Sequence, residues 1–431
     1  MNYAQTIDFL FNSVTSFQQV GADAYKPGLE RVEEFCRRIG NPQNSFCTIH
    51  VAGTNGKGSV SSMLASVLRQ AGYKVGLYTS PHLVDFRERI RVDGRMIPQQ
   101  DVVDFVGCNY GSIKELQLSF FEITTAMAFS HFALSGVEVA VIETGLGGRL
   151  DATNIIRPLV SVVTNIGLDH TALLGDTLQA VAAEKAGIIK SGVGIILGEG
   201  SESYNNVFEA RSAACGSQLI YAEQCYSHVG HRLCGGMQTI ELQNRMNGKP
   251  LSIEIDLLGE CQYHNVITAA TVVDYLNQNS PLTISCQAFR EGMSSVVANS
   301  SLQGRWQVVG QNPLTVYDTG HNAHGIRYVA EQISRFIEGG GRAYCVIGFA
   351  RDKSLDEVLE LLPRSAYYLF TAADSPRSLP AAQLCDMAAA AGLSGECAES
   401  VKAALQRARE MATANDMIFV GGSNFVVAEV L

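Results

Sequence analysis

A glycine-rich stretch at residues 50–59, His-Val-Ala-Gly-Thr-Asn-Gly-Lys-Gly-Ser, constrains the fold of this chain more than any other feature. It follows the apolar run 46–51, which is typical of a buried strand, and precedes residues 60–70, whose apolar positions recur at helical spacing. A glycine-rich turn between a strand and a helix aims bare backbone N–H groups at one point, which suits a phosphate group. The nucleotide-binding residues predicted from this stretch are Gly53, Thr54, Asn55, Gly56, Lys57, Gly58 and Ser59.

Lys57 adds the point charge that loops of this kind place on the terminal phosphates of a nucleotide. In the standard P-loop pattern a serine or threonine follows the lysine directly, whereas Gly58 stands between Lys57 and Ser59 here. The alternative is an ordinary glycine-rich turn that binds nothing. The strand before the turn and the helix after it favour phosphate binding.

Strand-like and helix-like segments alternate along most of the chain. After two expected helices within residues 1–40, whose apolar stripes include Phe17 and Phe35, buried strands are expected at 74–78, 137–142, 159–164 and 194–197. This alternation predicts a mainly parallel sheet with helices on both faces. Residues 217–260 carry shorter and more polar β-like runs, which indicate an antiparallel flap or edge.

A polar stretch of small residues at 297–304 separates two such patterns. Beyond it, strands are expected at 314–317, 343–347, 367–370 and 417–420, with helices between them. We therefore predict an α/β protein with a parallel-sheet P-loop ATP-binding domain at 1–296, a linker at 297–304 and a smaller Rossmann-like domain at 305–431.

Polar side chains follow the predicted strands, at the edge where open α/β sheets bind ligands. Glu143 ends a buried strand and is a candidate Mg²⁺ ligand beside nucleotide phosphates, with a helix cap or a loop ion pair as the alternative. Ser80 follows another strand and offers a hydroxyl ligand. His170 ends the third strand, where it is either a ligand, unusual for Mg²⁺, or a structural hydrogen-bonding group.

Lys185 lies in a predicted helix, next to Glu184 and among apolar neighbours. The residues alone favour a surface ion pair between these two side chains. If Lys185 is buried, its pKa falls, and a neutral amine can react with CO₂ to form an anionic carbamate that suits a hard cation. The charged run at 86–98 is expected to form a solvated face.

The second predicted domain contributes Arg305, Asp318 and His321, which lie near one short hairpin. Arg305 is suited to stabilising charge on a transferring phosphoryl group. Asp318 ends a strand and either accepts hydrogen bonds from a ribose or pairs with the arginine. His321 is a candidate contact of the phosphate or of a second substrate.

Composition excludes several classes of partner. The formal charge of −10, with no basic block to offset it, argues against nucleic acid. No apolar run approaches the roughly 18 residues of a membrane span, and no signal peptide is recognisable at the N-terminus. Eleven cysteines occur without a ligand-like spacing, and we expect most of them to be buried thiols in a reducing cytoplasm, among them Cys47, Cys108, Cys286 and Cys345.

Together these motifs resemble one family, the folylpolyglutamate synthases and bifunctional dihydrofolate synthases of the Mur ligase superfamily. A P-loop with Gly58 before Ser59 is the form of that family, and Gly-Leu-Gly-Gly-Arg-Leu-Asp-Ala-Thr-Asn at 145–154 is highly specific to it. The resemblance covers nearly the whole chain in order, at residues 50–59, 78–83, 86–90, 121–122, 143–154, 167–171, 184–190, 304–305, 318–322, 348–353 and 421–423.

The resemblance implies ATP-dependent addition of L-glutamate to dihydropteroate or to a folate through an acyl phosphate. Its implied cofactors are ATP and two Mg²⁺ ions, with K⁺ as a candidate monovalent ion. Ser80 and Glu143 would hold one Mg²⁺, and His170 with a carbamylated Lys185 would support the second. Asn265 would contact adenine. The implied catalytic residues are Lys57, Lys185, Arg305 and His321, and Arg305 and Asp318 would also bind the nucleotide.

Two other functions fit parts of this pattern. A Mur-type ligase of cell-wall synthesis would need a uridine-nucleotide-binding domain, and only about 40 residues precede the glycine-rich loop. A P-loop ATPase without ligase activity would not need the cluster around Arg305. We expect a cytoplasmic monomer that acts on small molecules and binds neither nucleic acid nor membrane.

Overall fold

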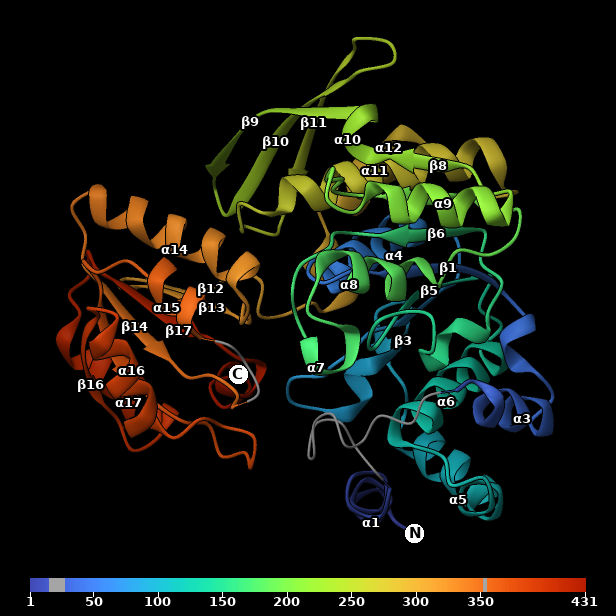
Figure 1. Cartoon of the computed structure of the whole chain (residues 1–431), viewed down its shortest axis with the longest axis horizontal. Coiled ribbons are helices and arrows are strands. Elements are labelled where there is room, and N and C mark those ends of the chain that lie inside the picture. The colour runs from blue at the N-terminus through green and yellow to red at the C-terminus, as the bar shows by residue number, and fades with distance from the viewer. Residues whose placement is uncertain (15–27, 352–354) are drawn as a thin grey trace. The chain divides into compact units, whose positions relative to one another are not determined.

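The computed structural model describes residues 1–14, 28–351 and 355–431 (Figure 1). They divide into two compact units, Met1–Asp256 with Gln262–Leu302, and Leu257–Cys261 with Gln303–Leu431. The apolar position Phe17, together with Asp352 and Lys353 of the family-like stretch at 348–353, lies outside the described residues. The short segment Leu257–Cys261 therefore belongs with the second unit, although the first unit resumes after it.

An eight-stranded sheet forms the centre of the first unit, in the order β4-β3-β2-β5-β1-β6-β7-β8. Six neighbouring strands run parallel, and β3 and β4 add an antiparallel edge. The predicted parallel α/β architecture is thereby confirmed. The strands are β1 Cys47–Ala52, β2 Val75–Tyr78, β3 Ile90–Val92, β4 Arg95–Met96, β5 Val139–Glu143, β6 Val160–Val163, β7 Ile195–Leu197 and β8 Leu219–Tyr221.

The central strands are nearly continuous apolar runs, because helices cover the sheet on both faces. Ile195 and Leu197 pack with side chains of α8 and α9 in one apolar cluster, while α11 contacts β6 and β7. Helix α4 packs on α11, α12 and α13. The helices are α1 Tyr3–Asp8, α3 Glu30–Arg38, α4 Lys57–Gln70, α5 Gln99–Glu115, α6 Phe120–Leu134, α7 Thr171–Leu174, α8 Leu178–Ala186, α9 Asn205–Cys215, α10 Ala222–Cys225, α11 Gln262–Asn279, α12 Cys286–Met293 and α13 Val296–Ser300.

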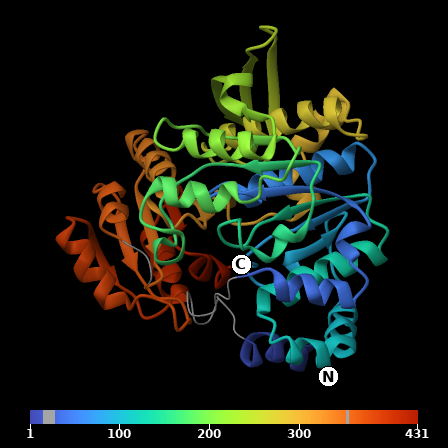
Figure 2. The ribbon, with the colours of Figure 1, turned by 45° about the vertical axis from the view of Figure 1, so that its right-hand side comes forward.

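A second, three-stranded antiparallel sheet in the first unit consists of β9 Tyr226–Cys234, β10 Met237–Asn244 and β11 Pro250–Ile255. It projects from the unit as a long hairpin with one added strand, as Figure 2 shows from a second angle. The antiparallel flap expected in residues 217–260 is confirmed. One part of that stretch differs, because β8 extends the parallel sheet instead.

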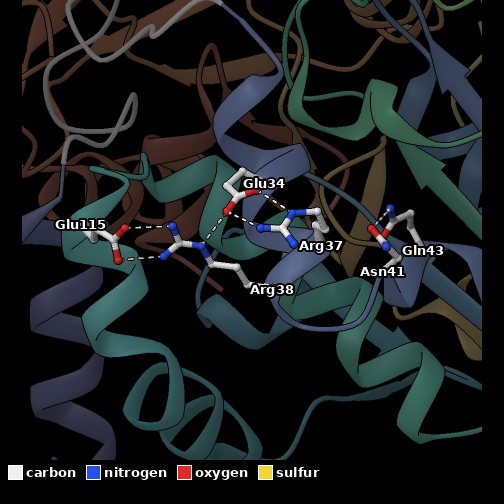
Figure 3. A network of polar contacts seen from close by, with 6 residues as sticks. All are labelled: Glu34, Arg37, Arg38, Asn41, Gln43 and Glu115. Carbon is white, nitrogen blue, oxygen red and sulfur yellow. Dashed lines mark hydrogen bonds and ion pairs between the residues drawn. The ribbon is translucent and has the colours of Figure 1, made fainter.

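Ion pairs on the surface join α3 to α5 (Figure 3). Both terminal nitrogens of Arg38 donate to Glu115 at 2.8 Å, and its Nε donates to Glu34 at 2.8 Å. Arg37 also donates to Glu34, and hydrogen bonds from the two arginines lower the pKa of Glu34 to about 2. Because these side chains are exposed or only partly buried, the pairs orient the helices more than they stabilise the fold.

A six-stranded sheet forms the second unit, in the order β12-β13-β17-β14-β15-β16, and only β12 is antiparallel to its neighbour. The four strands expected here are confirmed, while the short edge strands β12 and β16 were not anticipated. The elements are β12 Gln307–Gln311, β13 Leu314–Asp318, α14 Ala323–Glu338, β14 Ala343–Ile347, α15 Asp356–Leu361, β15 Tyr367–Phe370, α16 Ala381–Ala390, β16 Ser394–Cys397, α17 Val401–Met411, β17 Met417–Gly421 and α18 Asn424–Ala428.

Three expectations differ from the structure. The charged run at 86–98 is not a solvated face throughout, because Arg89 and Arg91 are buried in the first unit. Cys108 and Cys286 are exposed on α5 and α12, although Cys345 is buried as expected and all eleven cysteines carry free thiols. Residues 296–300 of the stretch around the expected linker form α13.

Candidate active site

The glycine-rich loop connects β1 to α4, as its sequence predicted, and two of its glycines are fixed by close packing. Gly56 is the N-cap residue of α4 and has a φ of +79°, and a Cβ atom there would lie 2.3 Å from Oδ1 of Asn265. A Cβ atom on Gly53 would lie 1.8 Å from Oγ1 of Thr164. Only glycine fits either position, so the loop backbone stays bare and close to its neighbours.

The loop is held in shape by the segment that follows β6. The backbone N–H of Thr54 donates to the Asn165 carbonyl at 3.0 Å, and the N–H of Asn55 donates to Oδ1 of Asn165 at 2.9 Å. The hydroxyl of Thr54 donates to the carbonyl of Gly167 at 3.0 Å. A loop braced in this way keeps its remaining donors in place before a ligand arrives, which is what preorganised phosphate binding requires.

Two lysines converge on one carbonyl of this loop. Nζ of Lys57 donates to the carbonyl oxygens of Gly53 at 3.0 Å and Thr54 at 3.2 Å, and Nζ of Lys185 donates to that of Gly53 at 2.9 Å. Lys185 comes from α8, far along the chain, so only the fold brings it to the loop. The positive charge of Lys57 suits a polyanionic ligand such as a triphosphate, and Lys185 places a second amine at the same carbonyl.

Lys185 is 4% exposed, so the surface ion pair favoured by the residues alone is wrong. Its neighbour Glu184 instead accepts a hydrogen bond from Arg149 at 2.8 Å. Burial and the charge of Lys57 lower the pKa of Lys185 to about 7, while Asp169 and Asp151 oppose that shift. A substantial fraction of Lys185 is therefore a neutral, nucleophilic amine near pH 7.

Glu143 and Ser80 meet at the carboxyl edge of the sheet. Glu143 ends β5 directly opposite Val51 of β1, which places its buried carboxylate beside the start of the glycine-rich loop. The backbone N–H of Ser80 donates to Oε2 of Glu143 at 3.1 Å. The described residues contain no group of three or more His, Cys, Asp or Glu side chains that are placed so that they could hold a metal ion. One carboxylate and one hydroxyl beside a phosphate site is nevertheless the donor set that Mg²⁺ takes when phosphates and water complete its shell, so these residues fit that ion.

His170 does not end a strand, as the sequence suggested, but precedes α7 after a loop that follows Val163. It adopts a left-handed conformation with a φ of +52°, and its Nε2 lies 3.9 Å from Oδ1 of Asp169. Of the two carboxylates that raise the pKa of Lys185, Asp169 has the larger effect, although sequence reasoning left this residue without a role. The sequence did offer a signal for Asp169, because it is an acidic residue that follows a buried strand and directly precedes His170.

Asp151 organises the loop between Glu143 and residue 155, and sequence reasoning also missed this function. Its Oδ2 accepts hydrogen bonds from the backbone N–H groups of Gly145 and Leu146, each at 2.8 Å. Its Oδ1 accepts from the N–H and the hydroxyl of Thr153 at 3.0 and 2.5 Å. Burial raises the pKa of Asp151, and these donors oppose that rise. The spacing Asp-x-Thr was a detectable sign of this turn.

His50 completes this arrangement from β1. Its Nε2 lies 2.8 Å from Oγ1 of Thr153. Because that hydroxyl already donates its proton to Asp151, it must accept from His50, which places the imidazole proton on Nε2. Nδ1 of His50 is buried and has no hydrogen-bond partner among the described residues, and burial lowers the pKa of His50 to about 3. His50 is therefore neutral at physiological pH.

In the second unit the structure brings Arg305, Asp318 and His321 together. Oδ2 of Asp318 accepts from the N–H of Trp306 and Oδ1 from that of Gly320, both at 2.7 Å. Arg305 donates to the Gly304 carbonyl at 3.0 Å and to the Thr319 hydroxyl. Nδ1 of His321 lies 3.0 Å from the Thr319 carbonyl, which requires a proton on Nδ1. Burial raises the pKa of Asp318, and the hydrogen bonds from its backbone donors and the charge of Arg305 oppose that rise.

Comparison with known proteins assigns this geometry to a family. Residues 51–273 match the Mur ligase middle domain, and residues 304–424 match the glutamate ligase domain of the Mur ligases. A dihydrofolate synthase/folylpolyglutamate synthase of Escherichia coli (strain K12) is 33% identical over 405 residues, which cover 94% of this chain and 90% of that protein. The chain belongs to this family of Mur ligases. As a family member it is a ligase enzyme.

Other relatives agree with this assignment. A probable bifunctional folylpolyglutamate synthase/dihydropteroate synthase of Haloferax volcanii is 34% identical across 100% of this chain, which spans only 50% of that longer protein. A solved structure of the E. coli protein FolC in complex with DHPP and ADP has a TM-score of 0.85 at 31% identity, covering 100% of this chain and 97% of that one. A related bifunctional enzyme with Mn, AMPPNP and L-glutamate bound has a TM-score of 0.84 at 29% identity, with the same coverage.

Proposed function

We propose that this chain joins L-glutamate to the carboxylate of dihydropteroate or of a folate, using ATP and releasing ADP and phosphate. The observation that carries the proposal is the convergence of Lys57 and Lys185 on the Gly53 carbonyl, beside the edge where Glu143 meets Ser80. This edge combines a phosphate cradle with oxygen ligands for a divalent cation. The relatives named for this reaction, and the nucleotide and glutamate bound in related structures, support it.

The reaction has two steps. An oxygen of the substrate carboxylate attacks the γ-phosphorus of ATP, the bond to the bridging oxygen of ADP breaks, and an acyl phosphate forms. The amino group of L-glutamate then attacks the acyl carbon, loses a proton and expels inorganic phosphate, leaving an amide. Such transfers between anions depend mainly on positioning and on cations that offset charge.

The residues of the first unit divide these tasks. Residues 53–59 bind the triphosphate through backbone N–H groups, and Lys57 moves from its loop carbonyls to the phosphates. Ser80 and Glu143 would hold Mg²⁺, which would supply positive charge to offset the negative charge of the triphosphate. Asn265, whose side chain lies against Gly56, is assigned to the nucleotide.

Lys185 is assigned to a carbamate that supports a second Mg²⁺ together with His170. Its neutral fraction near pH 7 makes the reaction with CO₂ feasible, because only the unprotonated amine is a nucleophile. In the second unit, Arg305 is assigned to charge on the transferred phosphoryl group, Asp318 to the nucleotide and His321 to the phosphate or glutamate. The use of K⁺ as a monovalent cofactor stays a prediction.

We further propose a cytoplasmic monomer that acts on small molecules and binds no nucleic acid. All eleven thiols are free, which fits a reducing compartment, and the net charge of −10 disfavours nucleic acid. Within the described residues, none of the helices combines the length and apolar character needed to span a bilayer.

The proposal is tested by measuring ADP release with dihydropteroate and, separately, with a folate monoglutamate, each with and without L-glutamate. We expect release that requires glutamate and at least one of the two carboxylate substrates. ADP release that ignores both would identify an ATPase and refute the ligase assignment. Comparison of the two substrates also shows whether the enzyme acts on dihydropteroate, on folates or on both.

A further inference from the structure

Arg89 is a buried cation next to the candidate metal edge, and the reaction proposed above gives it no role. It is 3% exposed and ends the 3₁₀ helix Phe86–Arg89. Its carbonyl accepts a hydrogen bond from the N–H of Thr79 at 3.0 Å, the residue that precedes Ser80. Arg89 is therefore tied by the main chain to the segment that presents Ser80 to Glu143.

The guanidinium of Arg89 has few direct contacts that compensate for its burial. Its Nε donates to Nδ1 of His82 at 2.7 Å, and its central carbon lies 5.1 Å from the centre of the Phe120 ring. Across the three described ranges, no carboxylate lies within 4 Å of it. Burial lowers the pKa of Arg89 to about 10, while Tyr78, Glu143 and Glu88 oppose that shift from a longer distance, so Arg89 is still charged at pH 7. A buried charge without a carboxylate in direct contact is expensive, and such groups concentrate at functional sites.

The terminal nitrogens of Arg89 are available to a ligand. No acceptor among the described residues bonds Nη1 or Nη2, and neither atom is one of the fully sealed polar atoms that lack a partner. Arg91, two residues further on, differs on both points. Its Nη1 donates to the Glu88 carbonyl at 2.5 Å, and its Nε is fully sealed.

His82 offers a second donor in the same place. Because Nδ1 accepts from Arg89, it carries no proton, and the imidazole N–H lies on Nε2. The rings around this pair are aromatic: Phe11 and Phe86 meet the imidazole at 5.8 and 6.3 Å, and Phe120 lies 4.9 Å from Phe11. A cation and an N–H donor within an aromatic cluster suit a carboxylate attached to a flat ring system.

We propose that Arg89, assisted by Nε2–H of His82, binds the substrate carboxylate that ATP phosphorylates. This inference rests on the ligase function proposed above and names the residue that holds its second anion. As the carboxylate becomes an acyl phosphate, its negative charge grows, so a guanidinium in a water-poor setting stabilises the product of that step more than the substrate. Planar donors of arginine match a carboxylate in a way that lysine does not.

Three variants test this assignment: Arg89→Gln, Arg89→Lys and, as the matched control, Arg91→Gln, which alters a second buried arginine of the same segment. For each, the KM for dihydropteroate or folate, the KM for ATP and kcat are measured, with the thermal midpoint as a check on folding. We expect Arg89→Gln to raise the KM of the carboxylate substrate by about 10-fold or more, as loss of a charged hydrogen bond does. Arg89→Lys should recover part of this loss, and Arg91→Gln should leave that KM unchanged.

The outcomes separate this inference from the proposed function. If the unaltered enzyme releases no ADP in response to the carboxylate substrate, the ligase assignment itself fails. If it does, and Arg89→Gln or Arg89→Lys retains the original KM for that substrate, the role of Arg89 is refuted. Should Arg89→Gln not fold, Arg89→Lys decides the question, because it keeps the charge and loses the planar pair of donors. An equal rise in the KM of ATP would show a general disturbance and also count against the proposal.

Discussion

Single residues of this protein acquire their chemistry from neighbours that are distant in sequence. Lys185 is an ordinary lysine beside a glutamate until α8 places its amine against the Gly53 carbonyl and near Lys57. His50 is likewise ordinary until Thr153 and Asp151 fix its proton on Nε2. In both cases burial changes the charge state, and the partners determine which state is useful.

Lys185→Ala should lose most ligase activity, because the variant cannot form a carbamate. A small carboxylate such as acetate, added to Lys185→Ala, should restore part of it by occupying the vacated space. Initial rates of ADP release with both substrates measure the effect. The same carboxylate added to the unaltered enzyme is the control and should not accelerate it. Unchanged activity in the variant would remove the carbamate from the account.

His50→Gln should alter how stability depends on pH. The folded-state pKa of His50 is about 3, below the ordinary value of 6.5, so the unfolded chain takes up a proton first as the pH falls. This group therefore lowers the free energy of unfolding by about 1.4 kcal/mol per pH unit between about pH 6.5 and 3. Glutamine does not titrate, so His50→Gln lacks this pH-dependent loss of stability.

The free energy of unfolding of the original chain minus that of His50→Gln should therefore decrease as the pH falls from 7 to 4. Chemical denaturation at several pH values, followed by circular dichroism, measures it. Other titrating groups are common to both chains and cancel in the difference. A difference that is constant across this range would show that His50 is not neutral in the folded protein.

How far the sequence predicted single residues depended on how local the signal was. Lys57 and Glu143 were singled out as candidates because each lies at or just after the end of a buried strand within a recognisable pattern. Asp151 and Asp169 were overlooked, and Lys185 and Arg89 were expected at the surface. Their burial depends on contacts between segments such as α8 and the loop after β1, which periodicity along one segment does not reveal.

At the scale of elements, α8 and the loop at 145–151 are locked together by close backbone packing. The N–H of Arg149 donates to the Glu184 carbonyl at 2.8 Å, and the side chain of Asn154 donates to the Gly187 carbonyl at 3.1 Å. This contact brings the helix of Lys185 to the loop that begins at Glu143. Long apolar strands and amphipathic helices were predictable from sequence, whereas short edge strands such as β12 and β16 carry too few residues for a period to appear.

Gly187→Ala should separate these two elements. A Cβ atom at Gly187 would lie 2.4 Å from the Cα of Arg149, which is backbone and has no rotamer to change. We expect a loss of about 1–3 kcal/mol in the free energy of unfolding, typical of overpacking, together with reduced activity. Gly111→Ala in α5 is the control, because nothing lies within 4 Å of its new methyl group. That control should be neutral or stabilising by up to about 1 kcal/mol, from helix propensity. Equal stabilities of the two variants would contradict the close packing.

At the scale of the whole molecule, the chain comprises two units, each with its own hydrophobic core and its own set of candidate site residues. The first contains the glycine-rich loop, both converging lysines and Glu143, and the second contains the turn of Arg305, Asp318 and His321. The order of the units and their α/β class followed from the alternation of segments. The placement of Leu257–Cys261 in the second unit could not be predicted, because five residues are too few to show a pattern of their own.

Activation of the substrate carboxylate by ATP leaves a record in the oxygen atoms of the inorganic phosphate that is released. The enzyme is incubated with ATP, L-glutamate and dihydropteroate or folate labelled with ¹⁸O in the reacting carboxylate. An acyl phosphate requires that one carboxylate oxygen leave with the phosphoryl group, so the account predicts one ¹⁸O atom in each inorganic phosphate formed from labelled substrate. Inorganic phosphate free of the label, formed while the amide accumulates, would contradict it.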